Sequence, residues 1–449
     1  MAEHPTDKSR KVDVEPMASS EDSIAHGTVM DADDDLLRHI GYKQEFRREF
    51  TRWSTLSYAI SIMGVLGSVP ASWSSPLAAG GPATAIWLSM TIRANAGATQ
   101  TERTVAELVS AYPTSGGMYF VTKQVFPEDK VPLAAWVIGW SNFLGQTAGV
   151  VLGSVAVTIA LLVLTDNKHP ASYVFGHVSD GSGWGSRGFS YLIGYLSVAW
   201  TMTDYDATAH ISEELHNAAV SGPVAIFQAV LVTWVVGVML NIALGFCAGN
   251  VLDTLASPLG NPAAQVFLNA AGKKTGLALW FWPILIQFFT GITAMLADTR
   301  TCFALARDEA LPLSRHLKKM NKYTQTPVFS VWAVVIVCCC LNLIALGSVQ
   351  TINGIFGVTA PAMDLSYIAV IAGRLYYENK HPIAKGPFQL GRWQKPINYI
   401  AIVWTLFISV ILFFPPANPV TAANMNYAVV IAGFIALFAL CWWYLGAKK

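Results

Sequence analysis

Long apolar segments are the feature that most constrains how this chain folds. A helix that spans the hydrocarbon core of a bilayer needs about 20 mainly apolar residues, and such segments follow one another along the second half of the sequence. Charged residues make up 13% of the chain, against about 25% in a typical soluble domain. The sequence therefore predicts an all-α membrane protein. The clearest predicted spans are residues 224–247, 277–305, 328–346, 352–375, 397–414 and 427–445.

One further apolar segment, residues 191–211, is interrupted by acidic side chains. Its first half is apolar and aromatic, and Asp204 and Asp206 follow at what should be membrane depth. A charge at the centre of a spanning helix costs about 2.5–3.5 kcal/mol, so such acids usually face a cavity. We therefore predict a helix that breaks near residues 200–206 and lines a solute site with its main chain, as in one class of secondary transporters. The alternative is an ordinary helix that ends at Met202, with both acids in interfacial water.

Basic residues predict the orientation of the chain. Residues 1–50 are polar with almost no apolar periodicity, which predicts a disordered tail, and residues 51–446 form the predicted membrane domain. Loops rich in Lys and Arg lie on the cytoplasmic side, so we expect both termini in the cytoplasm and the protein in the plasma or vacuolar membrane. The basic positions are Arg38, Lys43, Arg47, Arg48 and Arg52 before the first span, and the loops 306–327 and 374–395.

Three segments near the N-terminus are irregular. Residues 54–76 contain Gly64 and Gly67, which suit either a local unwinding or a helix-packing face. Residues 80–112 have the flanks of a span but a polar centre, and they must still cross the membrane if both termini are cytoplasmic. Residues 132–164 are 33 apolar or small residues in succession, which favours one long, tilted crossing.

Net charge and cysteine placement limit the partners. The formal net charge of +1 argues against a nucleic-acid partner. The six cysteines lie in apolar stretches without metal-ligand spacing, so we expect no metal and no cofactor. An intramembrane aspartyl protease is a rival for the Tyr205-Asp206 pair, but its second motif, Gly-x-Gly-Asp, does not occur in the sequence. We therefore expect a protein that is not an enzyme and whose surroundings are a lipid bilayer.

Five separated motifs together resemble the fungal amino acid, GABA and choline permeases of the amino acid–polyamine–organocation superfamily. The resemblance covers roughly residues 36–445 and is specific because the motifs occur in the family's order. It implies a secondary-active permease for amino acids or related small amines such as GABA or choline, coupled to protons. The motifs are TSGGMYF (114–120), WVIGWSNFLGQTAGV (136–150), WTMTDYDATAHISEE (200–214), ALARDEALP (304–312) and APAMDLSYI (360–368).

The resemblance also implies an inverted-repeat broken-helix transporter fold of twelve helices. This chain departs from it, because residues 152–164 resemble the end of the fifth helix yet follow directly on the middle of the third. About two crossings are missing, which leaves about 10 transmembrane helices instead of 12. A splicing or gene-model fault explains this best, so a non-transporting, degenerate permease is the alternative function.

In this family the substrate lies between the unwound middles of the first and sixth helices. The free N–H groups of an interrupted helix suit a carboxylate, and an acid suits the ammonium group of an amine. Trp200 and Tyr205 suit a quaternary ammonium through cation–π contact. The implied site residues are Met63, Gly64, Val65 and Leu66 in the first helix and Trp200, Thr201, Thr203, Tyr205 and Asp206 in the sixth.

Asp206 is the acid that we expect in the site, and it is also the candidate for carrying the coupling proton. Residues two apart on a helix point about 200° apart, so Asp204 should face water. His210 is within reach of Asp206 on one helix face, although we expect it in interfacial water.

Charges at two helix ends suit a cytoplasmic gate of ion pairs, although solvated end charges are the more frequent situation. The candidate gate residues are Glu213, Glu214, Arg307 and Asp308.

Overall fold

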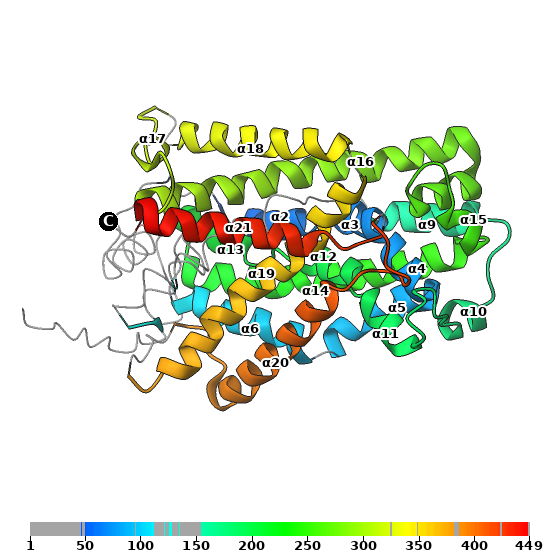
Figure 1. The fold of residues 1–449 in the computed structure, drawn as a ribbon, viewed down its shortest axis with the longest axis horizontal. Helices are drawn as coiled ribbons and strands as arrows, with labels where there is room; N and C mark the ends of the chain where they lie inside the picture. Colours follow the sequence, from blue (N-terminus) through cyan, green and yellow to red (C-terminus); the bar gives the residue numbers. More distant parts are fainter. Residues whose placement is uncertain are drawn as a thin grey trace, which may run out of the picture.

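The described part of the chain is helical, apart from one isolated β-bridge. In the computed structural model the helices run mostly lengthwise and form one elongated bundle (Figure 1). The predicted tail apart from Phe46 and Phe50, the first two motifs and most of the apolar run 132–164 lie outside the described residues. The structure describes residues 46, 50–94, 96–111, 121, 125–127, 134, 154–323, 326–347, 349–380, 386–422 and 424–447.

Six helices of the described chain are long and apolar enough to cross a membrane, and a seventh apolar helix is shorter. Every predicted span in the second half of the sequence lies on one of them, which confirms the all-α membrane architecture. The expected total of about 10 crossings includes segments outside the described residues. The six are Arg52–Ser72, Ala218–Cys247, Pro262–Arg307, Gly354–Tyr377, Gly391–Leu412 and Ala428–Leu445, and the seventh is Val328–Leu343.

The outer helices expose large apolar side chains. Phe288 on α16, Val403 on α20 and Phe434 on α21 each leave more than half of their surface uncovered. An aqueous surface would not favour such faces, whereas lipid chains cover them without cost. The outside of the bundle is therefore suited to a bilayer.

Two helix boundaries differ from those expected. α16 (Pro262–Arg307) is two helices joined at Gly272, whose φ of 68° is readily available only to glycine. The predicted loop 347–351 is wrong, because α18 (Val328–Gly347) and α19 (Val349–Tyr377) are separated by a single residue. The remaining long helices are α14 (Ala218–Cys247), α20 (Gln394–Leu412) and α21 (Ala428–Trp442).

The first spanning segment is broken at Gly64. α2 (Arg52–Met63) ends there and α3 (Val65–Ser72) begins directly after it. Gly64 has φ 63° and ψ 36°, a left-handed conformation that ends helices and that suits glycine. The sequence left a local unwinding and a helix-packing face as alternatives for this segment, and the structure shows the unwinding.

The second break lies where the acidic residues interrupt the apolar segment. α12 (Leu196–Met202) ends, Thr203 is extended with φ −80° and ψ 179°, and Asp204 has a positive φ of 63°. The chain then forms the short helix α13 (Ala207–His210). The predicted break near residues 200–206 is therefore present, and the alternative of a plain helix end in interfacial water is wrong.

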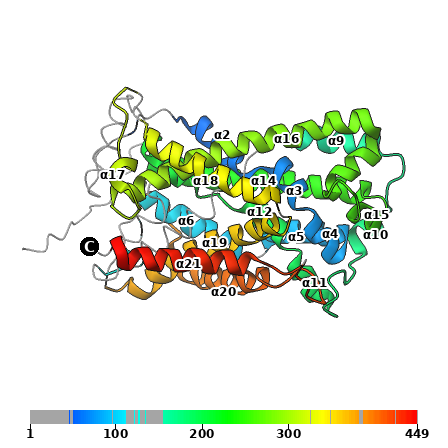
Figure 2. The same cartoon turned by 45° about the horizontal axis from the view of Figure 1, so that its top comes forward.

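The two breaks lie side by side in the middle of the bundle. α12 packs against α3, and α13 packs against α2 (Figures 1 and 2). α14 contacts both halves of the first broken helix. The irregular main chain is thus enclosed by helices, which is the condition for non-helical backbone at membrane depth.

The polar segment before residue 112 is helical and lies inside the bundle. It forms α5 (Pro82–Ala94) and α6 (Ala96–Ala111), and α6 packs closely on α14 and α20. Glu107 of α6 is buried, and its carboxylate accepts a hydrogen bond of 2.7 Å from Arg374 of α19. Partners on neighbouring helices therefore compensate for the weak apolar character of this segment.

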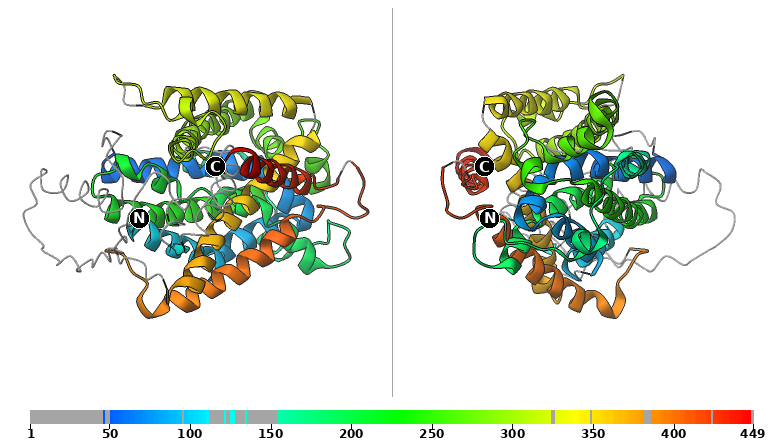
Figure 3. Two further views of the ribbon diagram at one scale, coloured as in Figure 1. Left: turned by 60° about the vertical axis from the view of Figure 1, so that its left-hand side comes forward. Right: turned by 90° about the vertical axis from the view of Figure 1, so that its right-hand side faces the viewer.

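The two ends of the bundle carry the connecting elements. α16 and α18 form one edge of the molecule and α20 the opposite edge (Figure 3). Short helices gather at either end, with α17 near the end of α21 and with α10, α11 and α15 at the far end. The short elements are α4 (Ser74–Gly80), α9 (Ser154–Leu164), α10 (Ala171–Gly176), α11 (Arg187–Ile193), α15 (Val251–Leu255), α17 (Ser314–Leu317) and the 3₁₀ turns Ser212–Glu214 and Gly391–Trp393.

Candidate binding site between the helix breaks

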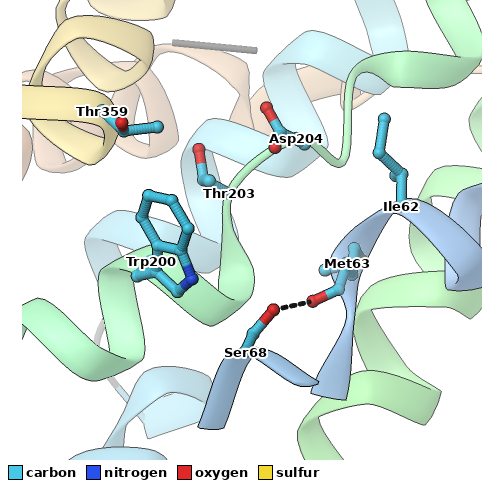
Figure 4. A pocket seen from close by; sticks show the side chains of 7 residues that line it. All are labelled: Ile62, Met63, Ser68, Trp200, Thr203, Asp204 and Thr359. Atoms are coloured by element: carbon cyan, nitrogen blue, oxygen red, sulfur yellow. Dashed lines mark hydrogen bonds between the residues drawn. The ribbon is translucent and has the colours of Figure 1, made fainter. Parts of the chain in front are cut away.

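A small cavity lies between the two helix breaks. Both broken helices and α19 contribute to its wall (Figure 4). Its volume is about 10 Å³, which is roughly the room that one water needs. A larger solute enters only when the breaks move apart, so the structure shows a closed state. The lining residues are Ile62, Met63, Ser68, Trp200, Thr203, Asp204 and Thr359.

Two polar groups of the second break are buried at this cavity without a protein partner. Asp204 is 4% exposed, and its Oδ1 has no hydrogen-bond partner among the described residues. The same holds for the hydroxyl of Thr203. A buried polar group without a partner costs about 1–3 kcal/mol, and more when it is charged. A bound water or a ligand in the cavity would complete these groups.

The first break has its own hydrogen bonds. The hydroxyl of Ser68 donates to the carbonyl oxygen of Met63 over 3.3 Å, so a carbonyl at the break is satisfied (Figure 4). Farther along, the hydroxyls of Ser72 and Ser197 are 2.9 Å apart and join α3 to α12. The two broken helices are therefore linked beside the cavity.

Asp206 points away from the cavity into the protein. It is fully buried, and its Oδ1 accepts a hydrogen bond of 2.6 Å from the hydroxyl of Tyr367 on α19. Its Oδ2 lies 3.4 Å from Nε2 of His210. The expectation that Asp206 faces the cavity and Asp204 faces water does not match this geometry. The reason is local, because the positive φ of Asp204 ends the helical rotation on which that expectation rested.

The other predicted site residues divide into two groups. Those on the cavity wall are Met63, Trp200 and Thr203. The rest lie around it: Gly64 forms the break, Val65 and Leu66 are buried in the first turn of α3, Thr201 donates to the carbonyl of Ser197 over 2.8 Å, and the ring of Tyr205 lies 5.2 Å from that of Tyr367.

His210 is not in interfacial water. It is 1% exposed, and its Nδ1 lies 3.1 Å from the hydroxyl of Thr301 on α16. The expectation was wrong because α16 covers the end of α13, which a sequence pattern does not reveal.

Buried ion pairs join the end of the second broken helix to α16. Glu214 accepts two hydrogen bonds from Arg300, of 2.6 Å to Nε and 3.2 Å to Nη2. Oε1 of Glu213 lies 3.5 Å from Nη2 of Arg307. We call these four residues the charged end. Both acids are buried, so the alternative of solvated end charges is wrong for them, whereas Asp308 at the end of α16 is exposed.

The chain that precedes α2 lies against the charged end. The ring of Phe46 is 4.6 Å from the guanidinium of Arg300 and packs edge-on against Phe303. The main chain of Phe50 accepts from His216 over 3.2 Å and donates to Glu214 over 3.1 Å. These contacts tie the start of the first broken helix to the end of the second.

Sequence reasoning missed several residues of this region. Asp298, an acid inside the predicted span 277–305, carries the same signal that marked Asp204 and was overlooked. Ser68 and Thr359 on the cavity wall carry no such signal, because small hydroxyl residues are common in membrane helices. Arg300 stands near the end of an apolar run, where it was counted as part of the predicted span.

The family comparison is consistent with this architecture. The family profile described as amino acid permease matches residues 50–176 and 155–436. An uncharacterised amino-acid permease of Schizosaccharomyces pombe is 42% identical over 485 aligned residues, which cover 94% of this chain and 89% of that protein. Amino-acid permease 2 of Neurospora crassa is 33% identical, over 92% of this chain and 87% of that protein. Among solved structures, a manganese transporter of Eremococcus coleocola shares 14% identity, with a TM-score of 0.42, over 86% of this chain and 93% of that chain.

The alignments also differ from the chain in length. The alignment with the S. pombe permease is longer than the chain, so that relative has residues without a counterpart here. The two matches of the family profile overlap between residues 155 and 176.

Proposed function

The chain belongs to the amino acid permease family, and from this premise we propose that it carries amino acids or related small amines through a membrane by alternating access. The observation that carries this proposal is the pair of helix breaks around a cavity with an unpartnered carboxylate and hydroxyl. A permease that binds a solute at membrane depth needs such groups, since lipid offers no polar partner. The solutes that suit the site include GABA and choline.

Each part of such a solute has a proposed contact. The ammonium group lies against Asp204 and the hydroxyl of Thr203. A substrate carboxylate lies near the start of α3, where main-chain N–H groups carry partial positive charge. Trp200 holds a quaternary ammonium through cation–π contact. As the breaks separate, the other predicted binding residues join the wall: Met63, Gly64, Val65, Leu66, Thr201, Tyr205 and Asp206.

Proton coupling is proposed at Asp206. Its contacts with the hydroxyl of Tyr367 and the imidazole of His210 suit a group that exchanges a proton. Asp204 lies two residues away in the same break, so the charge at the cavity depends on the state of Asp206.

The charged end is the proposed inner gate. Glu213, Glu214, Arg307 and Asp308 form it together with Arg300, with both termini in the cytoplasm of a plasma or vacuolar membrane. In the closed state its pairs seal the route from the cavity to that side. The gate opens when its ion pairs separate and water replaces each partner.

Radiolabelled uptake into permease-deficient yeast tests the proposal. We expect the wild-type protein to accumulate an amino acid, GABA or choline, and Asp204→Asn to lose this uptake. Asp206→Asn should keep exchange of internal for external substrate and lose accumulation driven by a proton gradient. Asp253→Asn, at an exposed position of α15, is the matched control and should behave as wild type. Absence of uptake by protein shown to reach the membrane would overturn the transporter function.

A second candidate function is that of a permease that binds its solute without moving it. The observations in its favour are that the S. pombe relative has residues without a counterpart in this chain and that the family profile matches in two pieces. Such a protein would be stabilised by substrate in a thermal-shift measurement and would show no uptake. Substrate protection together with uptake would eliminate this candidate.

A further inference from the structure

Buried carboxylates in the described bundle fall into two classes. Four of them have a basic partner: Glu107 with Arg374, Asp206 with His210, Glu213 with Arg307 and Glu214 with Arg300. Two others, Asp204 and Asp298, have no basic partner among the described residues. Oδ1 of each is buried without a hydrogen bond. Asp204 and Asp298 are therefore the two fully buried acids without a base in the described part of the bundle.

Asp298 lies in the same electrostatic environment as Asp204. It is 1% exposed on α16, and the charge of Asp204 acts on it. Tyr58 of α2 is within electrostatic reach of both acids and of Glu214 and Arg300. Asp298 lies one helical turn before Thr301 of α16, whose hydroxyl is 3.1 Å from Nδ1 of His210 at the end of the second break, and two residues before Arg300 of the charged end.

The nearest protein groups do not neutralise Asp298. Arg300 directs its guanidinium to Glu214 in two hydrogen bonds. The hydroxyl of Tyr58 donates to the main-chain carbonyl of Thr293 over 3.3 Å. Taking a carboxylate out of water is costly unless a cation and hydrogen bonds replace the water, and a second carboxylate nearby adds repulsion. One mobile cation that visits both acids relieves both penalties.

We propose that Asp204 and Asp298 are two successive binding positions for the ammonium group of the substrate, and that the permease therefore prefers organic cations over zwitterions. Asp204 holds the ammonium in the cavity, and Asp298 receives it on the way to the charged end. The proposal rests on the transport function above and narrows its substrate class. The class comprises amines whose net charge is positive, such as basic amino acids and quaternary amines.

Pairs of substrates that differ mainly in charge test the preference. We expect the wild-type protein to take up lysine in preference to norleucine and choline in preference to glycine betaine, by about 10-fold to 100-fold, the range of one charge-assisted hydrogen bond. Equal uptake within each pair would overturn the proposal. A sodium requirement, with sodium-22 binding that Asp298→Asn abolishes, would also overturn it, because the second position would then hold an inorganic cation.

Two variants separate the two positions. Asp204→Asn should raise KM for choline, since it removes the first contact. Asp298→Asn should lower the maximal uptake rate with KM little changed, because it acts after binding, and Asp298→Glu should restore the rate. Asp253→Asn, at an exposed position of α15, is the control for a general effect of lost charge. An Asp298→Asn protein with wild-type rate and selectivity would contradict the second position.

A binding measurement keeps this inference distinct from the transport function. If purified wild-type protein moves no substrate in proteoliposomes, the transport function fails. Thermal stabilisation by choline but not by glycine betaine, lost in Asp204→Asn and weakened in Asp298→Asn, would still support the cation preference. Equal stabilisation by the two compounds would overturn it.

Discussion

In the described part of the chain, buried acids have basic partners at the charged end and lack them at the cavity. At the charged end Glu213 and Glu214 each meet an arginine of α16. At the cavity Asp204 meets no basic group among the described residues, and its neighbour Thr203 also has an unpartnered oxygen. The comparison teaches that a buried carboxylate can serve two purposes in one bundle. Paired with arginine it joins two helices, and left unpaired it is the proposed contact for a cationic solute.

The largest expected contrast is between Glu214→Gln and Asp204→Asn. Removing the charge of Glu214 leaves Arg300 buried without its partner, so we expect a loss of about 3–5 kcal/mol in the free energy of unfolding. Removing the charge of Asp204 leaves no basic side chain without its partner, so the free energy of unfolding should be unchanged or slightly higher. Melting temperatures of the purified proteins in one detergent measure both effects.

A matched double variant sharpens this contrast. Glu214→Gln combined with Arg300→Met removes both charges and should recover most of the stability that Glu214→Gln loses, because no buried charge stays unpaired. If Asp204→Asn destabilised the protein as much as Glu214→Gln, the distinction between the two regions would be lost.

Asp206 is the intermediate case, since it lies beside the cavity and yet has protein partners. Tyr367→Phe removes the hydroxyl that donates to Asp206 over 2.6 Å. We expect a loss of about 1.5–3 kcal/mol, the range for a hydrogen bond to a charged group, measured as a lower melting temperature. Tyr376→Phe, at an exposed position of the same helix, is the control. An unchanged melting temperature would show that Asp206 belongs with the unpaired acids.

A smaller effect is expected at Phe46, which covers the charged end. Phe46→Leu keeps apolar volume and removes the aromatic face over Arg300, which is worth about 0.5–2 kcal/mol. The buried thiol of Cys302 on α16 reports opening, in a background in which the other cysteines are replaced by alanine. We expect faster maleimide labelling in Phe46→Leu. Equal rates would mean that this aromatic contact does not hold the end closed.

The smallest expected effect is at the hydroxyl pair between the two broken helices. Ser72→Ala removes one side of the 2.9 Å contact with Ser197 and should cost about 0.5–1.5 kcal/mol. The double variant with Ser197→Ala should cost little more than either single change. Additive losses would show that the two hydroxyls do not interact.

The residues themselves predicted the second break, whereas for the first they left unwinding and a packing face open, and only the family resemblance placed Gly64 in an unwound helix. Acids at membrane depth are too costly to face lipid, which marked residues 203–206, and a glycine in a small-residue context allowed the left-handed turn at Gly64. The spans followed from length and apolar composition. What the sequence did not give was the direction of each acid, because one positive φ at Asp204 changes the rotation of everything after it.

The charged end was predicted only in part. Glu213, Glu214 and Arg307 were recognised as charges at helix ends, but their partners depend on which helices meet. Arg300 appeared to belong to an apolar span, and Phe46 to a polar tail. Contacts between segments more than 80 residues apart are set by tertiary packing, which no local pattern encodes.

The bridge between Phe50 and Leu215 has a consequence for how the fold tolerates change. Both of its hydrogen bonds join main-chain atoms, so neither depends on the identity of the side chains beside them. Substitutions there can alter packing while the two main-chain segments stay hydrogen-bonded to each other. Main-chain hydrogen bonds thus connect the first and sixth helices of the family pattern, and most side-chain substitutions leave these bonds in place. A proline, which has no N–H group, or a change in chain length would break them.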